Sequence, residues 1–159
     1  MAENNRISEL NLDDSGLPPP TPEVDQERKV AIFDLLEDNR FGFSDPRAPA
    51  GPYRLDLSVQ DSRLVFDTYT EGGEAAGAFH LSLSPFRQVI RDYFQICQSY
   101  FDAVKRLPPA QIEAIDMGRR GIHDEGARTL LERLDGKLET DMGTARRLFT
   151  LICVLHFKG

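Results

Sequence analysis

The chain has 159 residues, 40% of them hydrophobic and 28% charged, a composition typical of a soluble globular protein with one buried core. Its formal net charge of −7 argues against bulk binding to nucleic acid or to an anionic membrane. Apolar runs fall short of the roughly 20 residues that span a membrane, and the first residues lack the basic and apolar blocks of a secretory signal. We therefore expect a cytoplasmic protein.

The first part of the chain predicts a strand and a helix joined by a stiff connector. Alternating leucines in ISELNL predict a short strand over residues 7–12, and the three prolines at 18–20 predict an extended link. Thr21, followed by proline and glutamate, is typical of a helix N-terminus, because its hydroxyl can accept from free backbone amides. Asn39 is a suitable end for this helix, and residues 41–51 predict a loop.

Three later segments predict an antiparallel meander. Apolar and polar residues alternate over residues 52–59, 63–69 and 78–83, as expected of strands with one buried and one hydrated face. Short turns that contain aspartate, serine or glycine separate these segments.

The second half of the chain predicts four helices. A serine–proline pair at 84–85 opens the longest, whose aromatic stripe should lie across the sheet. A proline pair at 108–109 begins the next, which Gly118 and Gly121 should end or bend, because glycine weakens a helix by roughly 1 kcal/mol relative to alanine.

The remaining two helices should each begin at a polar cap. Asp124 is a suitable cap for the third helix, and Asp141 or Thr144 for the fourth. The fourth helix is apolar on nearly all sides over residues 148–155, so it should be a central, buried element.

These elements together predict an α+β fold. We expect an antiparallel sheet of three or four strands with helices packed on one face, in the order β-α-β-β-β-α-α-α-α. Residues 1–21 should form the N-terminal strand and connector, and residues 22–159 a single globular domain.

The candidate functional site is the stretch EAIDMGRRGIHDEGAR at residues 113–128, where three glycines interrupt a run of arginines, carboxylates and one histidine. Side chains four apart share a helical face, and a helix that restarts here would add free backbone amides that point at an anion. Forked guanidinium donors and an imidazole titrating near neutral pH suit phosphate or carboxylate. The arginine pair at 146–147 adds positive charge if the last helix passes nearby. The predicted ligand-binding residues are Arg119, Arg120, His123, Asp124, Glu125 and Arg128.

Other interpretations of the same residues stay open. Arginines and carboxylates where helices meet commonly pair with one another. No metal site is predicted, because His123, Asp124 and Glu125 are adjacent and a helix would splay them. No nucleotide loop, nucleophile elbow or zinc finger appears, so no cofactor is predicted. Cys97 and Cys153 lie on apolar helical faces and are interpreted as buried free thiols.

Three functional hypotheses follow from this cluster. We expect a cytoplasmic binding or regulatory protein that holds a small anionic ligand or an acidic partner segment. One alternative is a small enzyme in which His123 and Glu125 act as acid–base groups on a phosphorylated or acyl substrate. Another is a protein–protein adaptor that uses the open sheet face or the edge strands. Binding is favoured over catalysis.

Several segments of the chain carry a resemblance to a known family. The chain resembles the short alphaproteobacterial proteins of the uncharacterised protein family of the UPF series, number 0262, in QIEAIDMGRRGIHDEGA, TARRLFTLICVLH, VAIFDLLEDNRF, PYRLDLSVQDSRLVF and SLSPFRQVIRDYF. The similarity spans about residues 22–158. It implies a cytoplasmic bacterial protein with no assigned activity, so it carries over no catalytic residue.

Overall fold

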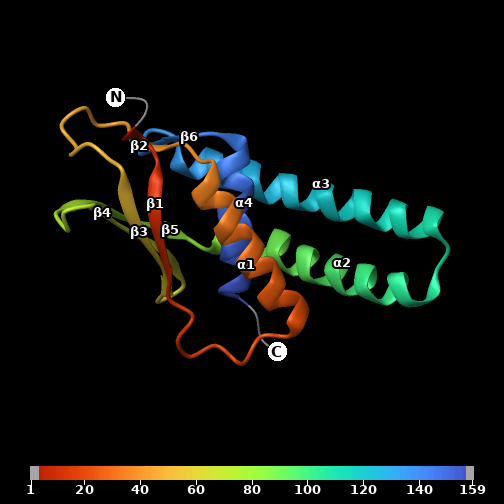
Figure 1. Cartoon of the computed structure of the whole chain (residues 1–159). Helices are drawn as coiled ribbons and strands as arrows, with labels where there is room; N and C mark the ends of the chain where they lie inside the picture. The colour runs from red at the N-terminus through yellow and green to blue at the C-terminus, as the bar shows by residue number, and fades with distance from the viewer. Residues whose placement is uncertain (1–3, 157–159) are drawn as a thin grey trace.

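The computed structural model describes residues 4–156, which form a four-stranded sheet with helices packed on one face (Figure 1). The strands lie in the order β1-β3-β4-β5. Their bounds are Ile7–Leu12 for β1, Tyr53–Gln60 for β3, Arg63–Thr70 for β4 and Ala75–Ser82 for β5. The predicted α+β class is confirmed.

The sheet is mixed rather than antiparallel throughout. Strands β3, β4 and β5 form the predicted antiparallel meander, with Leu57 opposite Phe66 and Phe66 opposite Phe79. Strand β1 instead lies parallel to β3, with Leu10 opposite Leu55. The chain leaves β1, passes through α1 (Pro22–Glu37) and returns to β3, and a helical crossover of this kind is the connection that parallel strands need. The antiparallel prediction was therefore wrong for β1.

Helix α1 is held at both ends by polar side chains. Its predicted cap is confirmed, since Thr21 Oγ1 accepts from the backbone N–H of Val24 at 3.2 Å. Beyond its C-terminus, Asn39 Oδ1 accepts from Ile7 N at 2.6 Å, and Asn39 Nδ2 donates to the carbonyls of Ile7 and Leu35 at 2.9 and 2.7 Å. One amide group thus ties the edge strand β1 to the end of α1.

A second, two-stranded sheet pairs β2 (Phe41–Phe43) with β6 (Leu138–Thr140) in antiparallel fashion. The loop prediction for residues 41–51 was wrong over β2. Three residues are too few to show an alternating pattern, and β2 forms because β6 supplies its hydrogen-bonding partner from almost 100 residues away along the chain.

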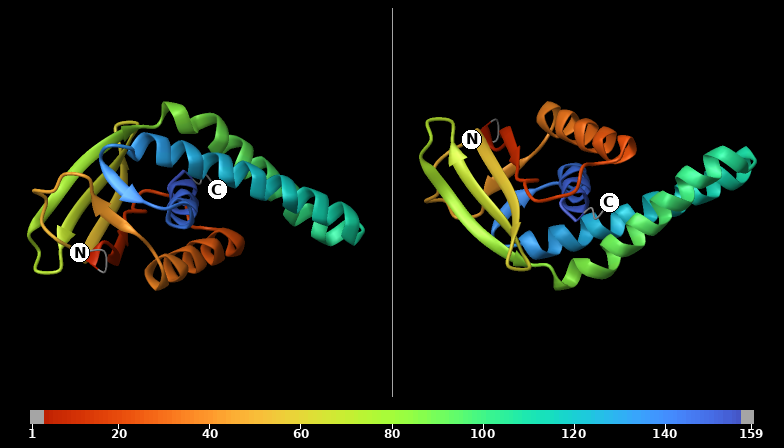
Figure 2. Two further views of the ribbon diagram at one scale, coloured as in Figure 1. Left: turned by 90° about the horizontal axis from the view of Figure 1, so that it is seen from above. Right: turned by 90° about the horizontal axis from the view of Figure 1, so that it is seen from below.

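Helices α2 (Arg87–Arg106) and α3 (Pro109–Leu134) run side by side and project from the body of the molecule (Figure 2). Helix α2 follows β5 through a 3₁₀ turn, η2 (Ser84–Phe86). Helix α3 is one continuous helix of 26 residues, so the predicted break at Gly118 and Gly121 and the predicted cap at Asp124 were wrong.

Close packing explains how a helix with three internal glycines stays continuous. A Cβ atom built on Gly126 would overlap the ring of Phe149, and one on Gly118 would lie 3.0 Å from Ile96 Cδ1. These glycines let α3 approach its neighbours closely, and the helix gains more from this tertiary packing than it loses in intrinsic propensity.

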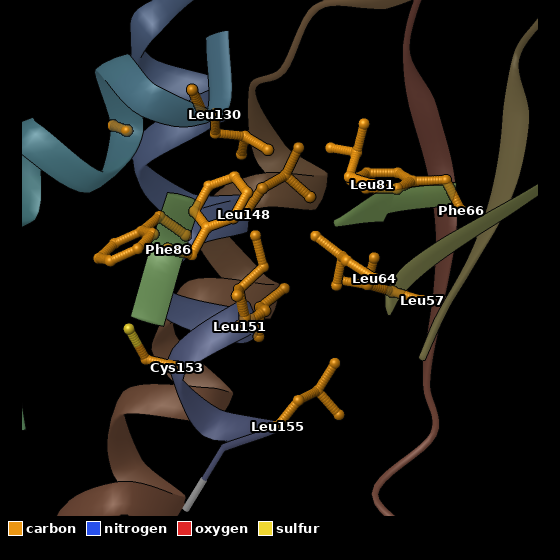
Figure 3. Packing of buried hydrophobic residues seen from close by; sticks show 14 of the residues in the cluster. Leu57, Leu64, Phe66, Leu81, Phe86, Leu130, Leu148, Leu151, Cys153 and Leu155 are labelled. Carbon is orange, nitrogen blue, oxygen red and sulfur yellow. The ribbon is translucent and has the colours of Figure 1, made fainter. Parts of the chain in front are cut away.

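Helix α4 (Met142–Val154) is the centre of the hydrophobic core, as predicted. Asp141 is its cap and accepts from Thr144 N at 2.8 Å. Figure 3 shows Leu148, Leu151 and Leu155 opposite the sheet residues that include Leu57, Leu64, Phe66 and Leu81. The two cysteines are free and buried, which confirms the interpretation of Cys97 and Cys153.

Two glycines of α3 should respond to alanine in opposite ways. Gly126→Ala should lower the free energy of unfolding by about 1–3 kcal/mol, because its methyl group would overlap Phe149 in a packed core. Gly121→Ala should raise it by about 0.5–1 kcal/mol, because open space surrounds this helical position. Urea titration measures both changes. A stabilising Gly126→Ala substitution would contradict close α3–α4 contact.

Candidate functional site

Helix α4 carries polar side chains along one stripe. From Thr144 to Val154 every residue is buried except Arg146, Arg147 and Thr150. Their spacing of one, three and four residues places all three on one face of the helix. This stripe is the floor of a groove.

The groove has a volume of about 530 Å³ and lies between α1 and α3. Figure 2 shows α4 between these two helices, which form the walls. Its volume falls within the roughly 300–1,000 Å³ typical of small-molecule pockets. The α1 wall consists of Gln26, Glu27, Val30, Ala31 and Asp34, and Tyr93 of α2 also lines the groove.

The opposite wall contains four of the six predicted site residues, namely Arg119, Arg120, His123 and Asp124. Because α3 is continuous, each residue is turned by about 100° from the last, and residues three and four apart share a face. Glu125, two residues from His123, is turned by about 200° and lies on the other side of the helix. Arg128 lies one turn beyond Asp124, past the end of the groove wall. Both are exposed, and neither lines the groove.

Two of these arginines are already bonded to a carboxylate of their own helix. Asp116 Oδ1 accepts from Arg119 Nη2 and Asp116 Oδ2 accepts from Arg120 Nη2, each at 2.6 Å. Hydrogen bonds from Arg119, and then from Arg120, hold the pKa of Asp116 below its ordinary value. Arg119 also lies over the Tyr100 ring, with 4.6 Å from its Cζ to the ring centroid. Both arginines are therefore paired within α3, and the side chain of Arg120 is also 68% exposed.

The arginines of α4 retain unused donors. Arg146 Nε donates to Asp124 Oδ1 at 2.7 Å, and Arg147 Nη1 donates to the carbonyl of Asp38 at 2.5 Å. A guanidinium group has five N–H donors, and within residues 4–156 neither arginine makes a further hydrogen bond. The last helix therefore does pass beside α3, and it brings the 146–147 pair into the same groove.

The imidazole of His123 is held by a threonine. His123 Nε2 lies 2.7 Å from Thr150 Oγ1, and Thr150 Oγ1 donates to the carbonyl of Arg146 at 3.3 Å. The Thr150 hydroxyl thus links the imidazole of α3 to the backbone of α4.

His123 does not titrate near neutral pH. Burial, with a smaller effect of Arg119 and Arg146, lowers the pKa of His123 to about 4, although Asp124 opposes the shift. The rings of Tyr93 and Phe149 contribute to this burial, at centroid distances of 5.3 and 5.4 Å. The imidazole is therefore neutral at physiological pH, and the prediction of a near-neutral titration was wrong.

The sequence analysis missed the carboxylates on the α1 wall. Glu27 is half-buried, and burial raises its pKa, although Arg119 at 3.8 Å and the Tyr93 hydroxyl at 3.5 Å favour the charged form. Asp34 is exposed and lines the same wall. Charged and apolar residues occur on every side of α1, so no local pattern indicates which carboxylates face the groove.

Residues 4–156 were compared with the geometry of metal clusters and of membrane-spanning helices. Among residues 4–156, no group of three or more His, Cys, Asp or Glu side chains is arranged to hold a metal ion. The helices in this range are also too short or too polar to cross a membrane.

Comparison with known proteins identifies the family. The model of an uncharacterised protein family, UPF0262, matches residues 4–158. The chain belongs to the UPF0262 family. The resemblance found in the sequence is thereby confirmed, and no solved structure matches the chain.

Three UPF0262 relatives show how far the similarity extends. The UPF0262 protein of Ruegeria pomeroyi is 69% identical over 157 residues, which cover 97% of this chain and 98% of its own. That of Roseobacter denitrificans is 68% identical over 158 residues, 97% and 99% of the two chains. That of Paracoccus denitrificans is 66% identical over 154 residues, 95% of each chain. The similarity therefore covers the whole groove.

The half-buried imidazole of His123 makes the stability of this UPF0262 protein depend on pH. Between pH 6.5 and 4 the unfolded chain binds a proton at His123 that the folded protein does not, so the free energy of unfolding falls as the pH falls. This contribution should amount to about 2 kcal/mol between pH 7.5 and pH 5. Urea titrations at both pH values measure it.

The matched variant is His123→Gln, which offers Thr150 both a donor and an acceptor but does not titrate. Between pH 7.5 and pH 5, the free energy of unfolding of this variant should fall by about 2 kcal/mol less than that of the unmodified protein. All other titratable groups are common to the two proteins, so the difference isolates the imidazole. Parallel pH profiles would show that His123 titrates normally in the folded state.

Proposed function

We propose that this protein is a binding protein that holds a small ligand bearing a carboxylate or phosphate group in the groove between α1, α3 and α4. One observation carries the proposal. Arg120 of α3 and Arg146 and Arg147 of α4 converge on a groove of about 530 Å³ while part of their donor capacity is unused.

The internal carboxylates are compatible with a bound anion. Exposed ion pairs stabilise a protein by about 1 kcal/mol or less, so Arg120 can turn from Asp116 to a ligand at small cost. Arg146 uses one of its five N–H groups on Asp124, and an added anion would take other donors of the same fork.

The state of His123 favours binding over acid–base chemistry. A neutral imidazole with a pKa of about 4 is a poor general acid at physiological pH. Glu125, its partner in the enzyme hypothesis, lies outside the groove. In the proposed role, His123 and Thr150 form a fixed polar surface beside the arginines, and Val30 and Tyr93 exclude water.

Ligand binding should depend on the arginines of α4. An Arg146→Gln, Arg147→Gln double variant should bind the ligand at least tenfold more weakly, because each lost charge-assisted hydrogen bond contributes about 1.5–3 kcal/mol. Isothermal titration against a panel of phosphates, nucleotides and acidic peptides measures this.

An Arg128→Gln, Arg133→Gln double variant is the control. It removes the same charge from exposed positions of α3 that do not line the groove, so its affinity should match that of the unmodified protein. Equal heats from the two double variants, or no heat with any ligand in the panel, would contradict the proposal.

A second candidate function, protein–protein adaptor, is favoured by an exposed apolar stripe on α1. Val30, Phe33 and Leu36 are 45%, 64% and 37% exposed, and spacings of three residues place them along one side of the helix. Exposed apolar residues that form a contiguous patch mark partner-binding surfaces. This stripe adjoins the groove through Val30, which lies in both.

The adaptor candidate predicts a loss of partner capture from one substitution. Phe33→Ser should abolish the recovery of specific proteins in pull-downs from the native bacterial lysate, with the free energy of unfolding changed by less than about 0.5 kcal/mol. The control is Met117→Ser, which alters a side chain that is 63% exposed on α3. This variant should still capture the proteins that the unmodified protein recovers. Mass spectrometry compares the captured proteins. Identical sets from the two variants would exclude this α1 surface as the adaptor site.

A further inference from the structure

We infer that the ligand of the groove is a zwitterion, with a carboxylate or phosphate at one end and a protonated amine at the other. This inference rests on the proposed function and specifies its ligand class. It follows from the charges that line the groove and from how they are already paired.

The charges of the groove are nearly balanced. Four arginines line it, together with three carboxylates, those of Glu27, Asp34 and Asp124. Asp116, which bonds two of the arginines, brings the count of carboxylates to four. A balanced site gives little overall attraction to a dianion, because the repulsion from the carboxylates offsets much of the attraction to the guanidinium groups. It suits a ligand whose own charges are separated.

The carboxylates differ in whether they are already paired. Asp124 lies 2.7 Å from Arg146, and Glu27 lies 3.8 Å from Arg119. Among the described residues, the side chain of Asp34 takes part in no ion pair or hydrogen bond. Asp34 is therefore the carboxylate that remains to receive a cation, just as Arg146 and Arg147 retain donors for an anion.

The groups that remain available to a ligand lie on different helices of the groove. Arg146 and Arg147 are on the α4 floor, and Asp34 is on the α1 wall. Val30 and Ala31 line this wall one turn before Asp34. In the inferred complex, a short carbon chain contacts this apolar section, with its anionic end at the arginines and its cationic end at Asp34. This arrangement gives the anionic and cationic ends of the ligand separate partners.

Two matched pairs of probes test the inference. O-phosphoethanolamine and ethyl phosphate differ by one amine, as do β-alanine and propionate. The amine-bearing member of each pair should bind about fivefold more tightly, although it carries less net negative charge. A groove that selected only for negative charge would give the reverse order. Chemical-shift titration of the ¹⁵N-labelled protein measures dissociation constants in the millimolar range that such small probes require.

An Asp34→Asn variant assigns the preference to one carboxylate. It should bind O-phosphoethanolamine and ethyl phosphate with affinities that differ by less than twofold. Glu37→Gln removes an exposed carboxylate of α1 that does not line the groove, and this control should keep the fivefold preference.

The outcomes separate this inference from the proposed function. Equal affinities of the two phosphates for the unmodified protein would overturn the zwitterion inference and leave the anion site standing. A preference that persists in Asp34→Asn would overturn the assignment of the amine to Asp34. If none of the four probes shifts the resonances of groove residues, the inference fails together with the anion site.

Discussion

The architecture depends on the burial of α4. This helix lies between the sheet, α1 and α3, and only three of its residues from Thr144 to Val154 are not buried. Each fully buried Leu, Ile or Phe side chain stabilises the fold by about 1.5–3 kcal/mol, so the orientation of α4 is set by its apolar faces. Arg146, Arg147 and Thr150 are then confined to the one side left open. The position of the groove is thus a consequence of how the core packs.

The contact between α3 and α4 decides which side chains reach that groove. Gly126 lets the α3 backbone lie against Phe149, and the close packing keeps α3 helical through its glycines. Continuity then separates residues by angle around the helix. It directs His123 toward α4 and turns Glu125 toward solvent, and it places Arg128 one turn beyond the groove. A stretch that looks like a single charged cluster in the sequence is divided by the helix into two faces.

Most of the charged side chains in and beside the groove are paired with a side chain of opposite charge. Asp116 forms ion pairs with two arginines, and Asp124 forms one with a third. Asp34 has no such partner in the described part of the chain. Burial also changes the chemistry of His123, because a half-buried imidazole near arginines stays neutral. These features favour recognition of a small polar ligand by fixed groups over proton transfer.

Features that depend on neighbours along the chain were determined by the sequence itself. These include the Thr21 cap of α1, the alternating strands of the meander and the apolar run of α4. The tertiary structure alone decided the parallel pairing of β1, the β2–β6 sheet and the entry of Asp34 into the groove. It also set the pKa of His123. Caps and periodicity act over a few residues, whereas strand pairing and burial depend on segments that are distant in the sequence and meet only in the folded chain.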